Sequence, residues 1–148
     1  MPVSLNLTGQ IHDLQAVVPE TDWFRASVLP EVGAKIYDLI WKPAGRNLLW
    51  HNPRILPQTY PIDGAFDNYW CGGWDDGFPT CDPCDYRGEL YPGLGELRSL
   101  RWQVQDSCAD REKVSVRLFT FGPISPVICG EDGQSPEPRI TAGMRRCI

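Results

Sequence analysis

The sequence predicts an all-β protein made of short antiparallel strands, and three observations support this fold class. The 148 residues include 14 glycines and 14 prolines, which interrupt helices and mark turns. Residues 113–121 (KVSVRLFTF) alternate Val114, Val116 and Leu118 with other side chains, the period of two that is typical of a strand. No stretch has the apolar period of 3.6 residues that an amphipathic helix needs.

Three further strands are predicted in the first half of the chain. Their ranges are Trp23–Leu29, Lys35–Trp41 and Asn47–Trp50. Short links that contain glycine separate them, so neighbouring strands should pair as an antiparallel meander. In the second strand, Ile36 and Asp38 are expected on one face, and Tyr37 and Leu39 on the other. Residues 1–22 have a mixed pattern and predict no strand.

The middle of the chain is expected to lie mostly outside regular structure. Residues 51–66 carry three prolines, which is typical of an extended connection over the surface. Residues 68–102 combine Trp, Cys, Gly and acidic residues, a mixture that neither a helix nor a strand interior favours. One more strand is predicted within residues 97–105.

The chain is expected to hold one β-rich domain at residues 1–121 and an irregular tail at residues 122–148. A length of 148 residues fits one domain with a real core. The tail has little alternation and no helical period, so it offers little apolar surface to offset the entropy of ordering it. Two explanations stay open: a strand-rich domain that is truncated or changed in reading frame, and an ordinary disordered tail.

Charge and composition argue against several partners. The net charge is −5, the pI is near 4.9, and no basic residues cluster, so neither nucleic acid nor a membrane surface is expected as a partner. The first residues lack the basic and apolar segments of a signal peptide. No apolar run approaches the roughly 20 residues that span a bilayer. The expected compartment is the cytoplasm.

The cysteines are expected to be reduced thiols, as is usual in that compartment. Cys81 and Cys84 form a CxxC motif, and Cys71 precedes it. A zinc site would need Cys108 or His51 as a fourth ligand, and a redox pair would need a strand-to-helix context. A single CxxC is weak evidence, so plain thiols are favoured over zinc and redox chemistry, and no metal or cofactor is expected.

Residues 68–102 are the first candidate for a ligand site. Aromatic faces pack on the C–H surfaces of sugars, and carboxylates accept hydrogen bonds from hydroxyl groups. Trp74 is predicted as a stacking surface and Asp75 as a hydroxyl acceptor, directly after two glycines whose bare backbone lets a ligand approach. The alternative is a long loop whose aromatic residues only cover the end of a β-core.

Three segments in this order resemble the aldose 1-epimerase, or galactose mutarotase-like, superfamily: VLPEVGAKIYDLIWKPAGRNLLWHNP, GGWDDGFPTCDPCDYRG and YPGLGELRSLRW. The resemblance runs from about Trp23 to Phe121 and is to uncharacterised, mutarotase-like members. It implies a large antiparallel β-sandwich with a sugar site in a cleft across one sheet, of which this chain covers roughly the first half. The family activity is the interconversion of α and β anomers of aldoses, in which a histidine and a carboxylate exchange protons with the sugar.

Two departures from the family pattern bear on catalysis. Relatives usually carry a histidine directly before the Gly–Glu pair, where this chain has Leu94, and leucine neither donates nor accepts a proton. The catalytic glutamate of the family lies late in the domain, beyond the part that this chain resembles. Of the two histidines, His12 and His51, only the second lies near a plausible site. His51 and Glu96 are therefore the candidate catalytic residues.

The same segments suggest residues that bind substrate. The predicted set is Lys35, Arg46, Asn52, Trp74, Asp75 and Glu96. Arg46 is the best suited to an anionic sugar or sugar phosphate, through its fork of donors. The predicted function is a cytoplasmic, aldose 1-epimerase-like protein of carbohydrate metabolism that binds or isomerises an aldose. The alternatives are a non-catalytic carbohydrate-binding module and a non-functional fragment; no oligomeric state is predicted.

Overall fold

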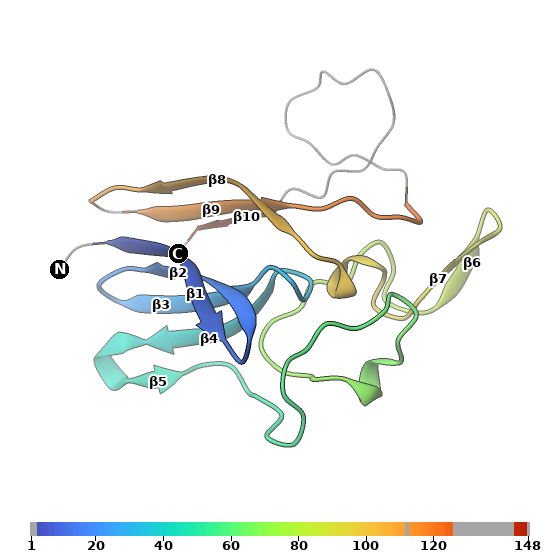
Figure 1. Cartoon of the computed structure of the whole chain (residues 1–148), viewed down its shortest axis with the longest axis horizontal. Helices are drawn as coiled ribbons and strands as arrows, with labels where there is room; N and C mark the ends of the chain where they lie inside the picture. Colours follow the sequence, from blue (N-terminus) through green and yellow to red (C-terminus); the bar gives the residue numbers. More distant parts are fainter. Residues whose placement is uncertain (1–2, 112, 126–143, 148) are drawn as a thin grey trace, which may run out of the picture.

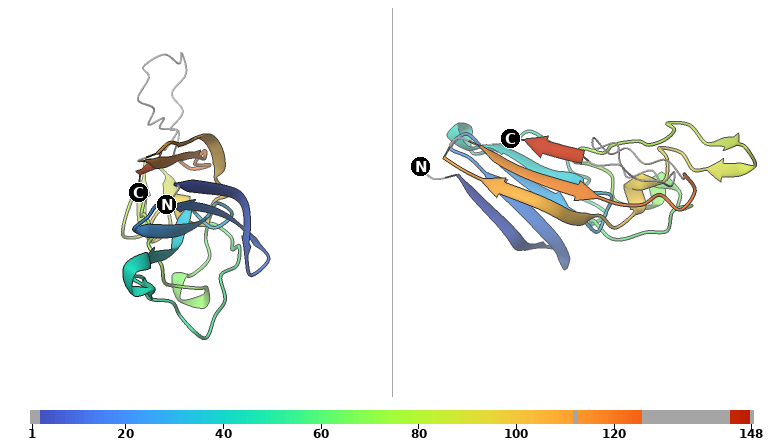
Figure 2. Two further views of the ribbon diagram at one scale, coloured as in Figure 1. Left: turned by 90° about the vertical axis from the view of Figure 1, so that its left-hand side faces the viewer. Right: turned by 90° about the horizontal axis from the view of Figure 1, so that it is seen from above.

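The computed structural model describes residues 3–111, 113–125 and 144–147, which form ten strands in three antiparallel sheets and three short 3-10 helices. Two of the sheets face each other across a hydrophobic core, as a β-sandwich (Figure 1 and Figure 2). The predicted all-β, antiparallel sandwich is therefore confirmed. None of the helices in these ranges is long and apolar enough to cross a membrane.

The larger sheet is a meander of the first five strands in chain order. They are β1 (Ser4–Ile11), β2 (Leu14–Glu20), β3 (Phe24–Leu29), β4 (Lys35–Trp41) and β5 (Arg46–Asn47). The predicted strands at 23–29 and 35–41 correspond to β3 and β4. The predicted strand at 47–50 is wrong in its extent, because pairing with β4 ends at Asn47.

The sequence patterns miss β1 and β2, since the turn between them contains neither glycine nor proline. His12 and Asp13 form this two-residue turn with positive φ angles of 48° and 57°. A hairpin turn of this kind needs φ > 0 at both positions and is usually Asn-Gly. Histidine and aspartate adopt that region more readily than most other side chains. The turn places His12 beside β4, as described below.

The smaller sheet has the strand order β10–β9–β8. Its members are β8 (Gln103–Ala109), β9 (Val114–Phe119) and β10 (Met144–Cys147). β9 corresponds to the predicted strand at 113–121. β10 lies within the tail that was expected to be irregular and pairs with β9 along all 4 of its residues, so that description fails for this segment. Residues 126–143 lie outside the described ranges, and the domain boundary at residue 121 stays a prediction.

The remaining strands form a hairpin that projects from one end of the molecule (Figure 1 and Figure 2). They are β6 (Cys84–Tyr86) and β7 (Glu89–Tyr91), and the 3-10 helices are Lys42–Ala44, Phe66–Asn68 and Leu97–Ser99. The predicted strand at 97–105 therefore begins later, with β8. Residues 48–75, called the connection here, run from β5 across the outer face of the larger sheet, which is the face turned away from β8–β10.

Apolar side chains fill the space between the two sheets. The buried members of this core are Val17, Ala26, Val28, Ala34, Ile36, Leu97, Trp102, Val116 and Leu118. A second buried cluster lies on the outer face and comprises Ala16, Leu29, Val32 and Tyr60. Burial of each large aliphatic side chain contributes about 1.5–3 kcal/mol. The larger sheet thus packs on both faces, against β8–β10 on one and, over part of the other, against the connection.

A β-bulge in β4 breaks the alternation that the sequence predicts. The register with β3 shifts between Asp38 and Ile36, so Tyr37 is an extra residue. As a result, Ile36 and Leu39 both contact the core between the sheets. Tyr37 and Asp38 both reach the outer face, where each contacts His51. The predicted grouping of Tyr37 with Leu39 is therefore wrong.

Gly33→Ala should destabilise the fold more than Gly45→Ala. Both glycines have a positive φ, +66° and +60°, which costs a non-glycine residue about 1–2 kcal/mol. A Cβ at Gly33 would also meet the backbone of Arg98, whereas nothing lies within 4 Å of a Cβ at Gly45. The clash should cost Gly33→Ala about 2 kcal/mol more, on the scale of overpacking. Urea unfolding measures both variants, and equal losses would contradict the close approach.

Candidate functional site

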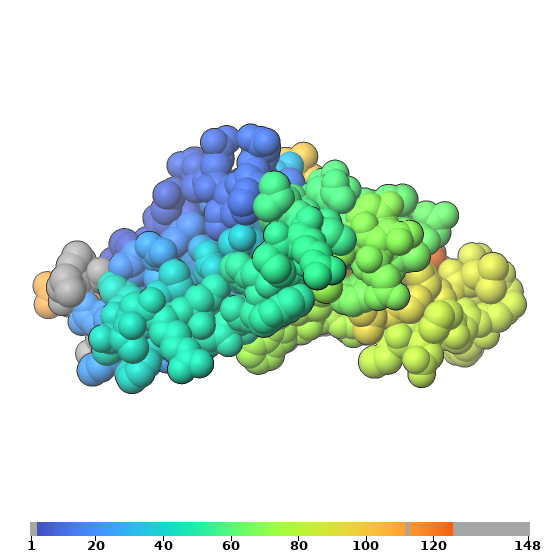
Figure 3. All heavy atoms as spheres, turned by 90° about the horizontal axis from the view of Figure 1, so that it is seen from below, coloured from blue at the N-terminus to red at the C-terminus, as the bar shows by residue number. Residues whose placement is uncertain are grey.

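Backbone hydrogen bonds join the connection to β4. Ile36 N–H donates to the Trp74 carbonyl at 3.1 Å, and Trp74 N–H donates to the Ile36 carbonyl at 2.9 Å. His51 forms a second antiparallel bridge, with Gly72. Figure 3 views this face of the molecule, with the connection (teal to green) against β4 and β5 (cyan). Such backbone bonds run in the plane of a sheet, so residues 72–74 lie beside the edge of β4, and the His51 ring reaches Tyr37 on the outer face.

The imidazole of His51 is fixed by groups of β4 and β5. Its Nε2 lies 2.6 Å from the Tyr37 carbonyl oxygen and 3.5 Å from Asp38 Oδ1. Because a carbonyl oxygen only accepts hydrogen bonds, we assign the proton of the neutral ring to Nε2 and the lone pair to Nδ1. Asn47 Nδ2 donates to Asp38 Oδ1 at 2.6 Å and orients that carboxylate. The His51 side chain is 25% exposed, so part of it reaches solvent.

Aromatic rings surround His51. Its ring centroid lies 4.1 Å from that of Tyr37 and 5.6 Å from that of Trp70. Tyr37 also contacts the second histidine: His12 Nε2 lies 3.3 Å from the Tyr37 hydroxyl oxygen. Burial, and then the Asp38 carboxylate, raise the pKa of Tyr37, so its phenol stays a hydrogen-bond donor at neutral pH.

These side chains form one group, which we call the His51 cluster: His12, Tyr37, Asp38, Asn47, His51 and Trp70. The sequence patterns single out only His51. Tyr37 and Asp38 are missed because strict alternation places them on opposite faces of β4. His12 is missed because its turn carries no recognisable signal. Trp70 belongs to the aromatic stretch at 68–102, but nothing local indicates which tryptophan faces His51.

A buried ion pair lies beside the His51 cluster. Lys35 Nζ is 3.0 Å from Asp75 Oδ2, and the two side chains are 0% and 23% exposed. Lys35 Nζ also lies 5.1 Å from the centroid of the Trp70 ring. Within the described residues, neither Lys35 Nζ nor Asp75 Oδ1 has a hydrogen bond of good geometry. The ionic contact with Asp75 and the cation–π contact with Trp70 therefore offset the desolvation cost of burying the ammonium group.

The pKa of Asp75 moves in the direction opposite to that of most paired carboxylates. Burial raises this pKa by more than the charges of Lys35 and Arg98 lower it. The folded protein thus holds the Asp75 proton more tightly than the unfolded chain does. As the pH rises from the pKa of an unfolded aspartate to the raised pKa of Asp75, the contribution of Asp75 to the free energy of unfolding therefore decreases. Above the raised pKa this loss of stability stays constant.

The structure separates two of the predicted sugar-binding residues. Trp74 pairs with Ile36 and is 52% exposed. Asp75 turns to the opposite side, towards Lys35, because successive side chains of an extended segment alternate. Trp74 and Asp75 therefore do not converge on one ligand, and Lys35, at 0% exposure, is sealed from one.

Arg46 and Asn52 flank the His51 cluster. Arg46 is exposed in β5, next to Asn47, and alternation directs its side chain away from the face that Asn47 shares with His51. Asn52 Oδ1 accepts a hydrogen bond from Arg54 N–H at 2.9 Å, and its Nδ2 lies 3.6 Å from Cys71 Sγ. The roles of both residues in binding stay predictions.

Glu96 is fully buried and links distant segments of the chain. Its carboxylate accepts hydrogen bonds from the backbone N–H groups of Ile124 at 2.8 Å and Ser125 at 2.9 Å. Its own N–H donates to the Phe78 carbonyl at 2.9 Å. No contact joins Glu96 to His51 in the described part of the chain, so the two predicted catalytic residues do not meet.

Metal ligation finds no support in the described ranges. No group of three or more His, Cys, Asp or Glu side chains there is placed to hold an ion. Cys71, Cys81, Cys84 and Cys108 are free thiols. The zinc alternative, which combined these thiols with each other or with His51, has no such group among the residues that the structure describes.

The architecture defines an all-β protein with a mutarotase-like sandwich, and two solved structures share it. A proposed mutarotase, YeaD, from Salmonella typhimurium matches 99% of this chain with a TM-score of 0.59 and 18% identity. The protein HI1317 matches 83% of this chain with a TM-score of 0.55 and 19% identity.

This chain spans 44% of the length of either structure. Its sequence matches no described protein family and no curated protein sequence. At these low identities the likeness shows the fold alone, and any activity has to be argued from the site.

Lys35→Met should lower the free energy of unfolding by about 3 kcal/mol, the lower end of the range for breaking a buried pair, because Asp75 is partly exposed. The double variant Lys35→Met/Asp75→Leu should recover most of that loss, since it leaves no unpaired charge. Urea unfolding of both single variants and the double variant at pH 7 gives the coupling energy. Strictly additive losses would show that the two side chains do not interact.

Proposed function

We propose that this chain binds a neutral aldose sugar at the His51 cluster, on the outer face of β4. The single observation that carries the proposal is the contact of the His51 ring with the ring of Tyr37, with the Asp38 carboxylate beside it. A sugar needs acceptors and donors for its hydroxyl groups and an aromatic surface for its C–H face. The cluster offers the Asp38 carboxylate, the His51 imidazole and the half-buried ring of Tyr37 close together, and Tyr37 and Asp38 are held by β4. The Trp70 ring is 3% exposed, so it packs against Tyr37 and is not itself a surface for the sugar.

A neutral sugar suits the site better than a sugar phosphate. Lys35 is fully buried and paired with Asp75, and Arg98 is 3% exposed with its guanidinium bonded to the carbonyl oxygens of Gly93 and Gly64. These cations are therefore not free to pair with a phosphate. Within the His51 cluster, Asp38 carries a carboxylate beside His51, and this negative charge would repel an anion.

The activity proposed for the site is the interconversion of sugar anomers. His51 Nδ1, which carries the lone pair, would take the proton of the anomeric hydroxyl as the ring C–O bond breaks. The ring oxygen would receive a proton from Tyr37 Oη–H, the neighbouring donor. Returning both protons after rotation about the C1–C2 bond closes the other anomer. The shared fold with a proposed mutarotase supports this choice.

A non-catalytic carbohydrate-binding module is the second candidate. Leu94 occupies the position where mutarotase-like relatives carry histidine, and the Glu96 carboxylate is occupied by two backbone N–H groups. Binding without interconversion would follow if His51 has no acid partner. In either case a cytoplasmic location is part of the proposal, in keeping with the free thiols.

His51→Asn should slow anomer interconversion by about 10²-fold or more, the usual contribution of a general acid or base, while sugar affinity changes much less. NMR exchange between the anomeric signals of glucose and galactose gives the rate, and titration of the same signals gives the Kd. Trp74→Ala is the matched control and should keep both values, because Trp74 pairs with Ile36, whose side chain is on the face opposite the His51 cluster.

Wild-type binding without any exchange would favour the binding module. A wild-type protein that binds neither sugar would overturn the proposal.

A further inference from the structure

The turn between β1 and β2 holds His12 in a backbone conformation that few side chains favour. His12 and Asp13 are its two residues, with φ angles of 48° and 57°. A positive φ is unfavourable for a residue other than glycine, and the usual sequence of such a turn is Asn-Gly. Backbone strain of this kind is concentrated at functional sites. A turn that only joined two strands would have no need of histidine at this position.

The side chain of His12 contacts Tyr37. His12 Nε2 lies 3.3 Å from the Tyr37 hydroxyl oxygen, and the two rings meet edge to face with their centroids 6.1 Å apart. His12 is exposed and Tyr37 is half-buried, so the contact lies on the side of the His51 cluster that faces solvent. Water competes for both partners there, and one hydrogen bond adds little net stability. Stability alone therefore gives a weak reason for the strained turn.

Tyr37 needs a hydrogen-bond donor if it is to act as the acid of the proposed reaction. When Tyr37 gives its proton to the ring oxygen of a sugar, its own oxygen becomes a phenolate. Burial, and then the Asp38 carboxylate, raise the pKa of Tyr37, so both disfavour the phenolate. An acid works best when its pKa lies near the working pH. A donor beside the Tyr37 oxygen would offset these two effects.

The other positively charged or N–H groups around the cluster are engaged elsewhere. Lys35 is fully buried in its ion pair, and the side chain of Arg46 is directed away from the face of the cluster. The proton on His51 Nε2 faces the backbone carbonyl oxygen of Tyr37 at 2.6 Å. His12 is the group that contacts the hydroxyl oxygen of Tyr37 itself.

We propose that His12 is a positioning residue of the His51 cluster, whose Nε2–H donates to the Tyr37 oxygen and stabilises the phenolate during anomer interconversion. This inference rests on the proposed function. It assigns the proton of neutral His12 to Nε2. His12 then occupies one lone pair of the Tyr37 oxygen, and the Tyr37 proton is free to point at the sugar. The sugar ring oxygen gains that proton as the ring C–O bond breaks, and His12 keeps its own.

Two substitutions of His12 test the hydrogen bond. His12→Gln places an amide nitrogen close to the position of Nε2, whereas His12→Asn is too short to reach Tyr37. Asparagine tolerates a positive φ, so His12→Asn keeps the turn. His12→Asn should raise the pKa of Tyr37 further and slow anomer exchange about tenfold or more, because a hydrogen bond to a charged oxygen is lost. Sugar affinity should stay unchanged, since this bond strengthens only in the transition state.

His12→Gln should keep both the pKa of Tyr37 and the exchange rate close to the wild-type values. The pKa is read from the NMR signal of isotope-labelled tyrosine Cζ, and the Tyr37 signal is the one missing from Tyr37→Phe. The rate comes from NMR exchange between the anomeric signals of glucose. Asp13→Gly is the matched control, because it relieves the other positive φ of the turn. It should raise the midpoint of urea unfolding and leave the pKa and the rate unchanged.

Three results would overturn the inference: a pKa of Tyr37 that does not rise in His12→Asn, an exchange rate that His12→Asn leaves unchanged, or an equal loss of rate in Asp13→Gly. The titration of Tyr37 needs no sugar, so a missing hydrogen bond is seen separately from a missing activity. A wild-type protein without exchange activity would overturn the proposed interconversion, and this inference with it.

Discussion

Two backbone hydrogen bonds between Ile36 and Trp74 pair the connection with the edge of β4, and the arrangement of side chains on the outer face depends on them. They require glycine at position 73, where φ is +67° and a Cβ would meet the Ile36 carbonyl oxygen. With this segment fixed beside β4, Asp75 comes to lie against Lys35 and Trp70 against Tyr37. One strand-like contact thus builds both the buried ion pair and the His51 cluster.

Three charged residues anchor the loops of this protein from inside: Lys35, Glu96 and Arg98, at 0%, 0% and 3% exposure. Glu96 accepts two backbone hydrogen bonds, and Arg98 donates to two carbonyl oxygens and a tyrosine hydroxyl. Lys35 relies on one carboxylate and one aromatic ring. Burying charge is expensive unless each hydrogen-bonding group is paired. The Lys35–Asp75 pair is therefore the least compensated of the three, and what it contributes is a defined position for residues 72–75.

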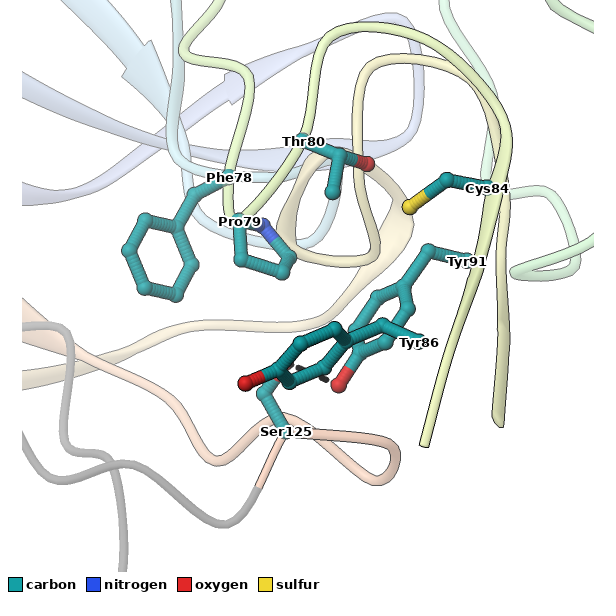
Figure 4. A pocket seen from close by; sticks show the side chains of 7 residues that line it. All are labelled: Phe78, Pro79, Thr80, Cys84, Tyr86, Tyr91 and Ser125. Atoms are coloured by element: carbon teal, nitrogen blue, oxygen red, sulfur yellow. Dashed lines mark hydrogen bonds between the residues drawn. The ribbon is translucent and has the colours of Figure 1, made fainter. Parts of the chain in front are cut away.

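The His51 cluster and the hairpin end of the molecule are built from different parts of the fold and differ in chemistry. In the His51 cluster, a bulge in β4 brings Tyr37 and Asp38 onto one face, where the loop residue His51 meets them. A pocket beside the β6–β7 hairpin is formed by that hairpin, residues 78–80 and Ser125, and its lining is aromatic and uncharged (Figure 4). A shared sandwich fold does not determine which part of the molecule binds a ligand, since one fold hosts many functions. The likeness to two structures at 18% and 19% identity therefore leaves function to the chemistry of the sites.

The sequence by itself determined the all-β class, β3, β4 and β9, because a period of two and glycine or proline turns are local signals. It did not determine the β1–β2 hairpin, whose turn uses His12 and Asp13 in place of glycine. The face that Tyr37 presents depends on a register shift, which is a property of two paired strands and not of one. The buried position of Glu96 likewise depends on backbone groups nearly thirty residues away. Only the tertiary structure decides such matters, because they rest on pairing between segments that no local pattern connects.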